Sequence, residues 1–226
     1  MGEVIGAILT PAVGVALSPL PIIAVILMLF SAKARINGPA FVGGWIVGLA
    51  VVVGVVLVLA GPAEMADTED GPSTFSGLIH LLLGFALLSL AFRQWQGRPQ
   101  AGVTPEAPRW IRSIDSVTPV AAVGFGAFRS GLNPKNLIFN ISAATSIAQA
   151  DLPAGQAILA AVIFIVLASV SVAGPVIWYL VAQEPASRTL EGVKGWLERN
   201  NAIVMMVLFV VLGVGQIGKG IAGLFG

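Results

Sequence analysis

The chain has 226 residues, of which 57% are hydrophobic and only 10% are charged, and its mean hydropathy is +0.93. Soluble globular domains carry about 25% charged residues, so this composition excludes a soluble domain and predicts a membrane protein. The net charge is +1, and the sequence has no basic patch of a size to support nucleic-acid binding. The absence of cysteine excludes disulfides, a thiolate metal site and thiol redox chemistry.

Six apolar stretches follow one another along the chain, and each is long enough to cross a bilayer, which takes roughly 20 residues. The predicted spans are 5–31, 39–61, 75–95, 118–149, 154–182 and 200–222. No basic signal segment precedes the first span, so we expect it to be retained. Residues 183–200 carry charges of both signs and are expected to include a short interfacial helix over 188–199. The fold expected is an all-α membrane protein with one polytopic domain, 1–226.

The first span contains a helix break at Ser18-Pro19. Serine is a favoured N-cap residue, and proline is favoured just inside a helix start because its missing N–H costs nothing there. Pro21 falls in the same first turn. This pattern predicts a helix that begins near the bilayer midplane, although an ordinary proline kink is the alternative.

The second span contains Gly44 and Gly48, a pair of small residues four positions apart that predicts close packing against another helix. The third span contains His80, the single histidine, for which we expect a hydrogen bond to a neighbour rather than a proton relay.

The fourth span repeats the break of the first at Asn133-Pro134. Three spans in each half make the halves enter the membrane from opposite faces, as in the inverted repeats of secondary transporters. We therefore predict two inverted three-helix repeats, 1–95 and 118–222, joined by a loop over 96–117, with spans one and four broken at the midplane. The free N–H groups and positive dipole ends of the two restarted helices would favour an anion.

Polar side chains gather at the second break. Arg129, Asn133, Lys135, Asn136 and Asn140 lie within twelve residues, and the three asparagines follow helical spacing. Neither cation has an acidic residue within any predicted span to pair with, so together they would hold a carboxylate or phosphate-like group. In the alternative interpretation, Arg129 snorkels or bonds to backbone carbonyls, and Lys135 caps the end of the broken helix.

The charged loops predict the orientation. The loops after spans one, three and five hold nine cationic residues, whereas the opposite side holds only Lys219 and most of the loop acids. Because cytoplasmic loops are enriched in Lys and Arg, both termini are expected outside and the 96–117 loop inside. The nine cations are Lys33, Arg35, Arg93, Arg98, Arg109, Arg112, Arg188, Lys194 and Arg199.

The sequence offers little for catalysis. It contains no nucleophile elbow, zinc-binding helix or phosphate-binding loop. An intramembrane hydrolase pairing Ser18 or Ser130 with His80 has no local motif to support it. We expect no enzyme, no cofactor and no metal site.

The two breaks resemble the LysE superfamily of bacterial exporters. The residues concerned are Leu17-Ser18-Pro19-Leu20-Pro21 and Leu132-Asn133-Pro134-Lys135-Asn136. Members of the superfamily carry Pro-Gly-Pro in the first span and Asn-Pro-Lys in the fourth, and Leu20 stands here in place of the central glycine. The longer context is most similar to the branch called GAP or Sap, the sulfolipid-addressing proteins of actinobacteria.

The resemblance implies export across the bacterial plasma membrane, with a cell-envelope lipid such as a glycolipid as the cargo of the branch and amino acids or small ions as cargo of the wider superfamily. The absence of an acid within the spans favours an anionic or amphiphilic cargo over a zwitterionic amino acid. The expected site is Ser18, Pro19, Pro21, Arg129, Asn133, Pro134, Lys135, Asn136 and Asn140. Expected partners are membrane lipids, the substrate and a second copy in a homodimer. A non-transporting subunit of an envelope-lipid export complex is the alternative from another class.

Overall fold

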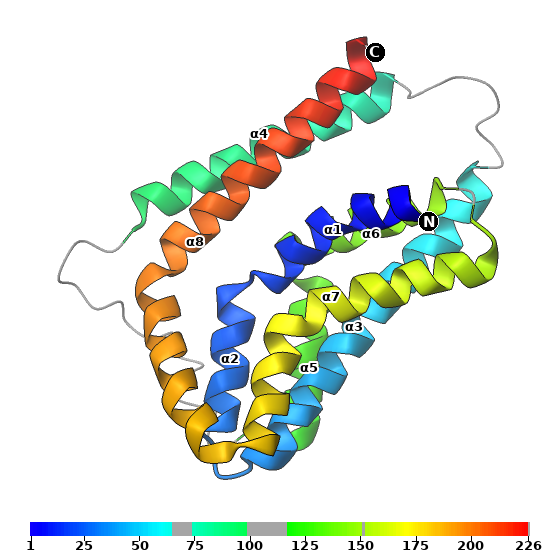
Figure 1. Ribbon diagram of the computed structural model, residues 1–226. Helices are drawn as coiled ribbons and strands as arrows, with labels where there is room; N and C mark the ends of the chain where they lie inside the picture. Colours follow the sequence, from blue (N-terminus) through cyan, green and yellow to red (C-terminus); the bar gives the residue numbers. More distant parts are fainter. Residues whose placement is uncertain (65–73, 99–116, 151, 226) are drawn as a thin grey trace. The chain divides into compact units, whose positions relative to one another are not determined.

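The structure is a computed structural model that describes residues 1–64, 74–98, 117–150 and 152–225. Throughout these ranges the regular structure is helical, with eight α-helices and one π-helical turn (Figure 1). Most of the predicted 96–117 loop lies outside the described residues. All-helical structure, predicted from hydropathy, is confirmed.

The helices follow the six predicted apolar stretches. Span one corresponds to two helices, span four to two helices and a π turn, and each remaining span to one helix. In chain order the elements are α1 (Gly2–Ala16), α2 (Pro19–Leu29), α3 (Ala34–Glu64), α4 (Thr74–Gln96), α5 (Pro119–Ala127), the π turn η2 (Phe128–Leu132), α6 (Pro134–Ala148), α7 (Ala154–Val181) and α8 (Gln183–Phe225).

Several of these helices are long and apolar enough to cross a membrane. Among the described residues three qualify, over Ala34–Leu59, Ala154–Val181 and Gln183–Ala222. The pair α1 and α2, which is bent by 55° at the predicted break, makes a fourth if it is taken as one span. Since α5 and α6 are interrupted by η2, neither reaches the length of a span alone. The chain is a membrane protein with three or four candidate spans.

Residues 188–199 are helical, as predicted, but the prediction of a separate short helix is wrong, because they belong to the continuous helix α8. Pro185 lies in the first turn of α8, where proline is tolerated. No proline follows it in the sequence, so the backbone hydrogen bonds can continue from the charged segment into the last apolar stretch.

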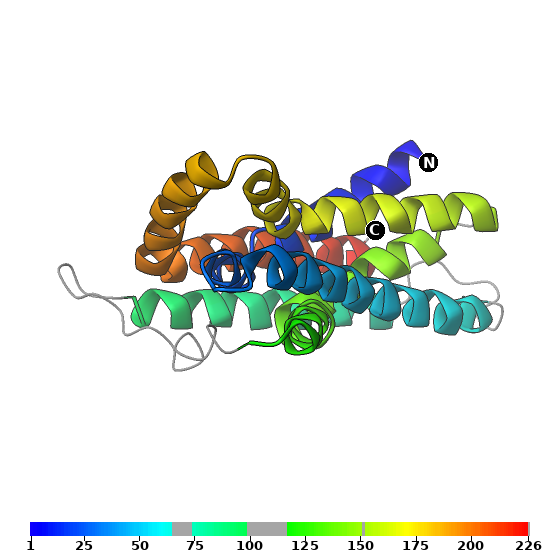
Figure 2. The ribbon, with the colours of Figure 1, turned by 90° about the horizontal axis from the view of Figure 1, so that it is seen from below.

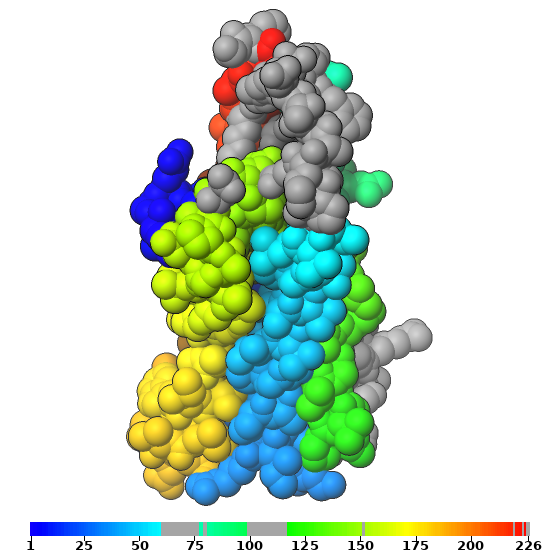
Figure 3. All heavy atoms as spheres, turned by 90° about the vertical axis from the view of Figure 1, so that its right-hand side faces the viewer, coloured from blue at the N-terminus to red at the C-terminus, as the bar shows by residue number. Residues whose placement is uncertain are grey.

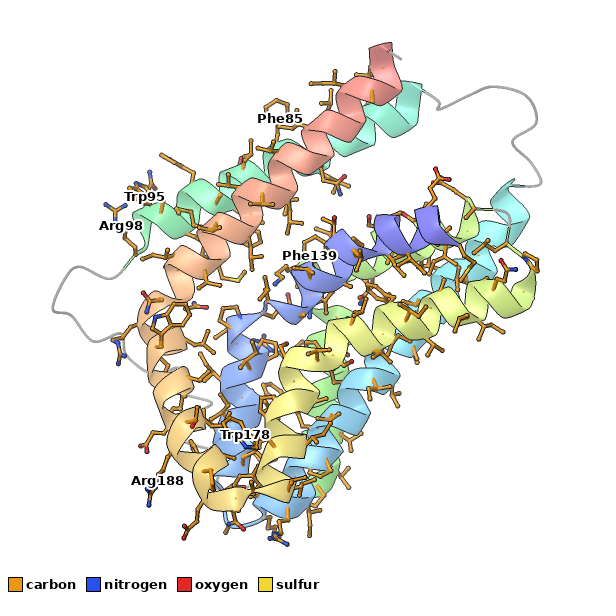
Figure 4. The ribbon with its side chains drawn as sticks, in the orientation of Figure 1. Phe85, Trp95, Arg98, Phe139, Trp178 and Arg188 are labelled. Carbon is orange, nitrogen blue, oxygen red and sulfur yellow. The ribbon has the colours of Figure 1, made fainter. Side chains whose placement is uncertain are left out.

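By their internal contacts the helices form two compact units. The first unit contains α1, α2, α3, η2, α5, α6, α7 and α8 up to Leu197, and the second contains α4 and the rest of α8. In the second unit, Gly84 and Gly213 bring the backbones of α4 and α8 into close contact. Arg98, after the end of α4, stacks at 3.6 Å over the ring of Trp95 (Figure 4).

In the first unit, α3 lies between α5 and α7, as two views show (Figures 2 and 3). A Cβ atom at Gly44 would fall on the carbonyl oxygen of Val123, and one at Gly48 would fall on Ala127 and Ser130. The close packing predicted for this glycine pair is confirmed. The same unit packs α1 against α6 and α7.

The surface of α7 is apolar as well as its core-facing side. Val162, Val166 and Val170 are exposed, whereas Ala161 and Ala168 are buried. Exposed valines are expected of a helix that faces lipid, and buried alanines let it pack closely against other helices.

Candidate functional site

The first break lies between α1 and α2. Leu17 ends α1, and Ser18 is extended, with φ −102° and ψ 102°, before α2 starts at Pro19. The side chain of Ser18 makes no capping hydrogen bond to α2. The predicted break is therefore confirmed, but the predicted capping role of Ser18 is wrong, because its hydroxyl is bound elsewhere.

The second break follows a π turn. α5 continues into η2, Asn133 is extended with φ −65° and ψ 122°, and α6 starts at Pro134. The Asn133 side-chain oxygen accepts a hydrogen bond from the backbone N–H of Lys135 at 3.1 Å. The cap predicted at this break is confirmed.

Prolines leave few backbone donors at either break. Pro19 and Pro21 have no N–H, so Leu20 supplies the only one among the first three residues of α2. In α6, Pro134 has none and the N–H of Lys135 is bound by the cap. The positive character of the site therefore comes mainly from a side chain, the ammonium group of Lys135.

Lys135 joins the two breaks. Its ammonium donates to the hydroxyl of Ser18 at 2.7 Å and to the carbonyl of Leu17 at 3.4 Å. These partners are more than a hundred residues away in sequence. Since Lys135 lies in the first turn of α6, the positive end of its own helix disfavours its charge, while the negative end of α1 favours it.

The ammonium is surrounded mostly by neutral groups. The ring of Phe139 lies 6.0 Å from it, and this ring packs against Gly14 of α1 (Figure 4). Ser18 is only 4% exposed and Asn136 is 0% exposed. Within the described residues, the contacts of the Lys135 ammonium are a hydroxyl, a carbonyl and an aromatic ring.

Asn136 and Asn140 hold the backbone of the π turn. Asn136 donates to the carbonyl of Arg129 at 2.9 Å, and Asn140 donates to the carbonyl of Ser130 at 3.0 Å. Ser18 donates in turn to the side-chain oxygen of Asn136 at 3.3 Å. A continuous chain of hydrogen bonds thus runs from η2 through Asn136 and Ser18 to Lys135.

Comparison with known proteins decides the family. The family described as Sap, sulfolipid-1-addressing protein, matches residues 8–222, which is nearly the whole chain. The chain belongs to the Sap family. Neither the curated proteins nor the solved structures contain a significant match to it. The resemblance noted at the two breaks is confirmed. The description of the Sap family names no catalytic activity.

In this member of the Sap family, the structure brings together most of the residues predicted for the site. Ser18, Lys135 and Asn136 are in direct contact, and Asn133 caps the same helix. Arg129 takes part through its backbone carbonyl. Its guanidinium carbon lies 5.8 Å from the ring of Phe125, and its buried Nε has no hydrogen-bond partner in the described part of the chain.

Sequence reasoning missed several contributors. Ser171 of α7 donates to the carbonyl of Ala16 at the end of α1, and Ser130 offers the carbonyl that Asn140 binds. Phe139 and the Leu17 carbonyl complete the surroundings of Lys135. Isolated serines in apolar spans carry no distinguishing pattern, because most bond to their own helix, as Ser169 does to Ile165.

In the described residues no three His, Asp or Glu side chains gather in a group that could hold a metal ion. The structure does not describe the side chain of His80, so the hydrolase pairing with Ser18 or Ser130 stays an untested alternative.

Proposed function

We propose that the chain is a secondary transporter that exports an anionic or amphiphilic cargo, a cell-envelope glycolipid, across the bacterial plasma membrane by alternating access. The observation that carries this proposal is the ammonium of Lys135, which contacts the end of the opposite broken helix at Ser18 and Leu17. A cation at the meeting point of two breaks can hold the anionic headgroup of a cargo, and a change of contact there can move one half against the other.

The charge balance favours an anion. The sequence has no Asp or Glu over residues 4–63 or 116–150, so both segments that meet at the breaks lack a carboxylate. A charge within a membrane costs from about 2.5 kcal/mol upward. An anionic headgroup would offset this cost, whereas the ammonium group of an amino acid would add to it.

The packing of the first unit supports a repeat. α3 packs on α5 and α6, and α7 packs on α1 and α2. If the two halves of the chain are exchanged, span one takes the place of span four and α3 that of α7. The packing of α3 on α5 and α6 then corresponds to the packing of α7 on α1 and α2. Each half also gives its first two spans to the first unit and its third to the second. This correspondence is expected of two repeated halves, and inverted repeats underlie alternating access in many carriers.

The family description supports a lipid cargo, because it names sulfolipid-1. The proposed site then has named roles. Lys135 holds the anionic group, Asn133 fixes the start of α6, and Asn136 and Asn140 hold the backbone around it. With no nucleotide-binding motif in the sequence, an ion gradient or the gradient of the cargo would drive export.

A flipping assay with the purified chain tests the proposal. Proteoliposomes receive acyl-labelled sulfatide, a sulfated glycolipid, or unsulfated galactosylceramide, and movement between leaflets is measured under an imposed proton or sodium gradient. We expect sulfatide to move and Lys135→Ala to reduce its rate at least tenfold. Lys33→Ala, at an exposed lysine in the turn before α3, is the matched control and should leave the rate unchanged.

Three outcomes would contradict the proposal. Equal rates for Lys135→Ala and the unmodified chain would remove the proposed role of the ammonium. If sulfatide does not move under either gradient and pull-down finds a stable partner, the alternative of a non-transporting subunit is favoured. If the chain instead catalyses counterflow of amino acids or small ions, the exporters of the wider superfamily are the better model.

A further inference from the structure

Both described hydrogen bonds of the Ser18 hydroxyl join it to residues of α6, the helix that starts at the second break. It accepts from Lys135 at 2.7 Å and donates to Asn136 at 3.3 Å. It makes no bond to the first turn of α2, the helix that it precedes. The side chain of Ser18 therefore does not cap α2. It binds the Lys135 ammonium, on which the proposed function depends.

Lys135 already uses most of its hydrogen-bonding capacity within the chain. A lysine ammonium has three donors, of which one is directed to Ser18 and one to Leu17. The Phe139 ring covers a further side at 6.0 Å. Because two donors are already bonded within the chain, a sulfate or phosphate group that takes more than one of the three must displace the Ser18 hydroxyl or the Leu17 carbonyl.

We infer that Ser18 is an internal competitor for the anionic group of the cargo rather than one of its ligands. Cargo binding exchanges the Lys135–Ser18 hydrogen bond for a bond to the cargo anion, and the same exchange releases the end of α1 from the start of α6. Ser18 thus sets the affinity for cargo by opposing it. This inference rests on the proposed function, whose anion site is the Lys135 ammonium.

The roles of ligand and competitor predict opposite changes in cargo affinity when the Ser18 hydroxyl is removed. A ligand, when removed, weakens binding, whereas a competitor, when removed, strengthens it. Hydrogen bonds to charged groups are short and strong, so removal of a competitor should change affinity by about tenfold. Damage to the fold would not produce tighter binding, so the sign separates competition from a merely structural role.

The experiment measures binding of dansyl-labelled sulfatide to the full chain in phosphatidylcholine nanodiscs, by energy transfer from the tryptophans. We expect Ser18→Ala to bind sulfatide about tenfold more tightly than the unmodified chain, and Ser18→Asp, which places a carboxylate beside Lys135, to bind it at least tenfold more weakly. Ser169→Ala is the matched control: this serine is 5% exposed and bonds only within its own helix. Labelled galactosylceramide, which lacks the sulfate, should not respond to Ser18→Ala.

Weaker or unchanged binding by Ser18→Ala would overturn the inference. Lys135→Ala separates this failure from failure of the proposed function. If Lys135→Ala loses sulfatide and Ser18→Ala also weakens binding, only the competitor role is wrong. If Lys135→Ala binds sulfatide like the unmodified chain, the anion site itself is wrong.

Discussion

At the scale of single residues, the breaks are held by side chains that bind backbone carbonyls. The last carbonyls of a helix have no partner within it, and lipid cannot supply one. Ser171 and Lys135 bind those of Ala16 and Leu17 at the end of α1. Asn136 and Asn140 do the same for the π turn. The helices can therefore stop inside an apolar unit because polar side chains from elsewhere satisfy their ends.

Asn140 provides a test of this principle. It is 0% exposed, and its amide donates to the carbonyl of Ser130. We expect Asn140→Leu to lower the free energy of unfolding by about 1–2 kcal/mol, since the buried carbonyl loses its donor. The measurement is reversible unfolding in mixed detergent micelles, followed by circular dichroism.

Ser146→Ala is the control for that variant, because Ser146 lies on the same helix and bonds only to Ser142 one turn earlier. Equal stability of Asn140→Leu and Ser146→Ala would show that the π turn does not depend on this amide.

At the scale of elements, α3 approaches α5 and η2 through glycines. The positions of Gly44 and Gly48 admit no Cβ without displacing the backbone of Val123 or Ala127. A Cβ atom at Gly126 of α5 would likewise fall on the backbone carbonyl of Phe41 in α3. The π turn, which contains Ser130, therefore lies directly against α3 at Gly48. This contact connects the glycine packing to the geometry of the second break.

Alanine at these glycines gives a direct test. We expect Gly44→Ala and Gly48→Ala each to lower the unfolding free energy by about 1–3 kcal/mol, since overpacking forces backbone shifts. Gly43→Ala is the control, because a Cβ at Gly43 meets nothing within 4 Å. Thermal unfolding in detergent would measure the difference. If Gly43→Ala were as harmful as Gly48→Ala, loss of helix flexibility rather than close packing would be the cause.

At the scale of the whole molecule, charge placement makes a prediction about orientation. The exposed residues Lys33 and Arg35 lie beside the turn between α2 and α3, and Arg188 is exposed near the start of α8 (Figure 4). Positive residues favour the cytoplasmic side, so we propose that these segments face the cytoplasm and that both termini lie outside.

Because the chain has no cysteine, single cysteines can report this orientation without background. We expect Gly2→Cys to react with a membrane-impermeant maleimide in intact cells, and Ala32→Cys to react only after the cells are permeabilised. Both residues are exposed. The reverse pattern of labelling would show that the loop charges do not set the orientation of this chain.

The sequence by itself determined the helical spans, because a bilayer span requires a long apolar run. It also predicted the two breaks, because Ser18-Pro19 and Asn133-Pro134 both have the composition of a helix start, and the close approach at Gly44 and Gly48. The inverted repeat, the orientation and the homodimer stay predictions. It placed Asn133 as a cap correctly because a cap binds within its own helix.

Only the tertiary structure decided what the polar residues at the breaks bind. Ser18 and Asn133 have the same local pattern before a proline, yet Asn133 caps its helix while Ser18 binds Lys135 and Asn136. The same folding brings in Ser171, which no local pattern marks. A buried hydroxyl bonds to whichever group packing brings within reach, and for Ser18 and Ser171 that group lies more than a hundred residues away in sequence.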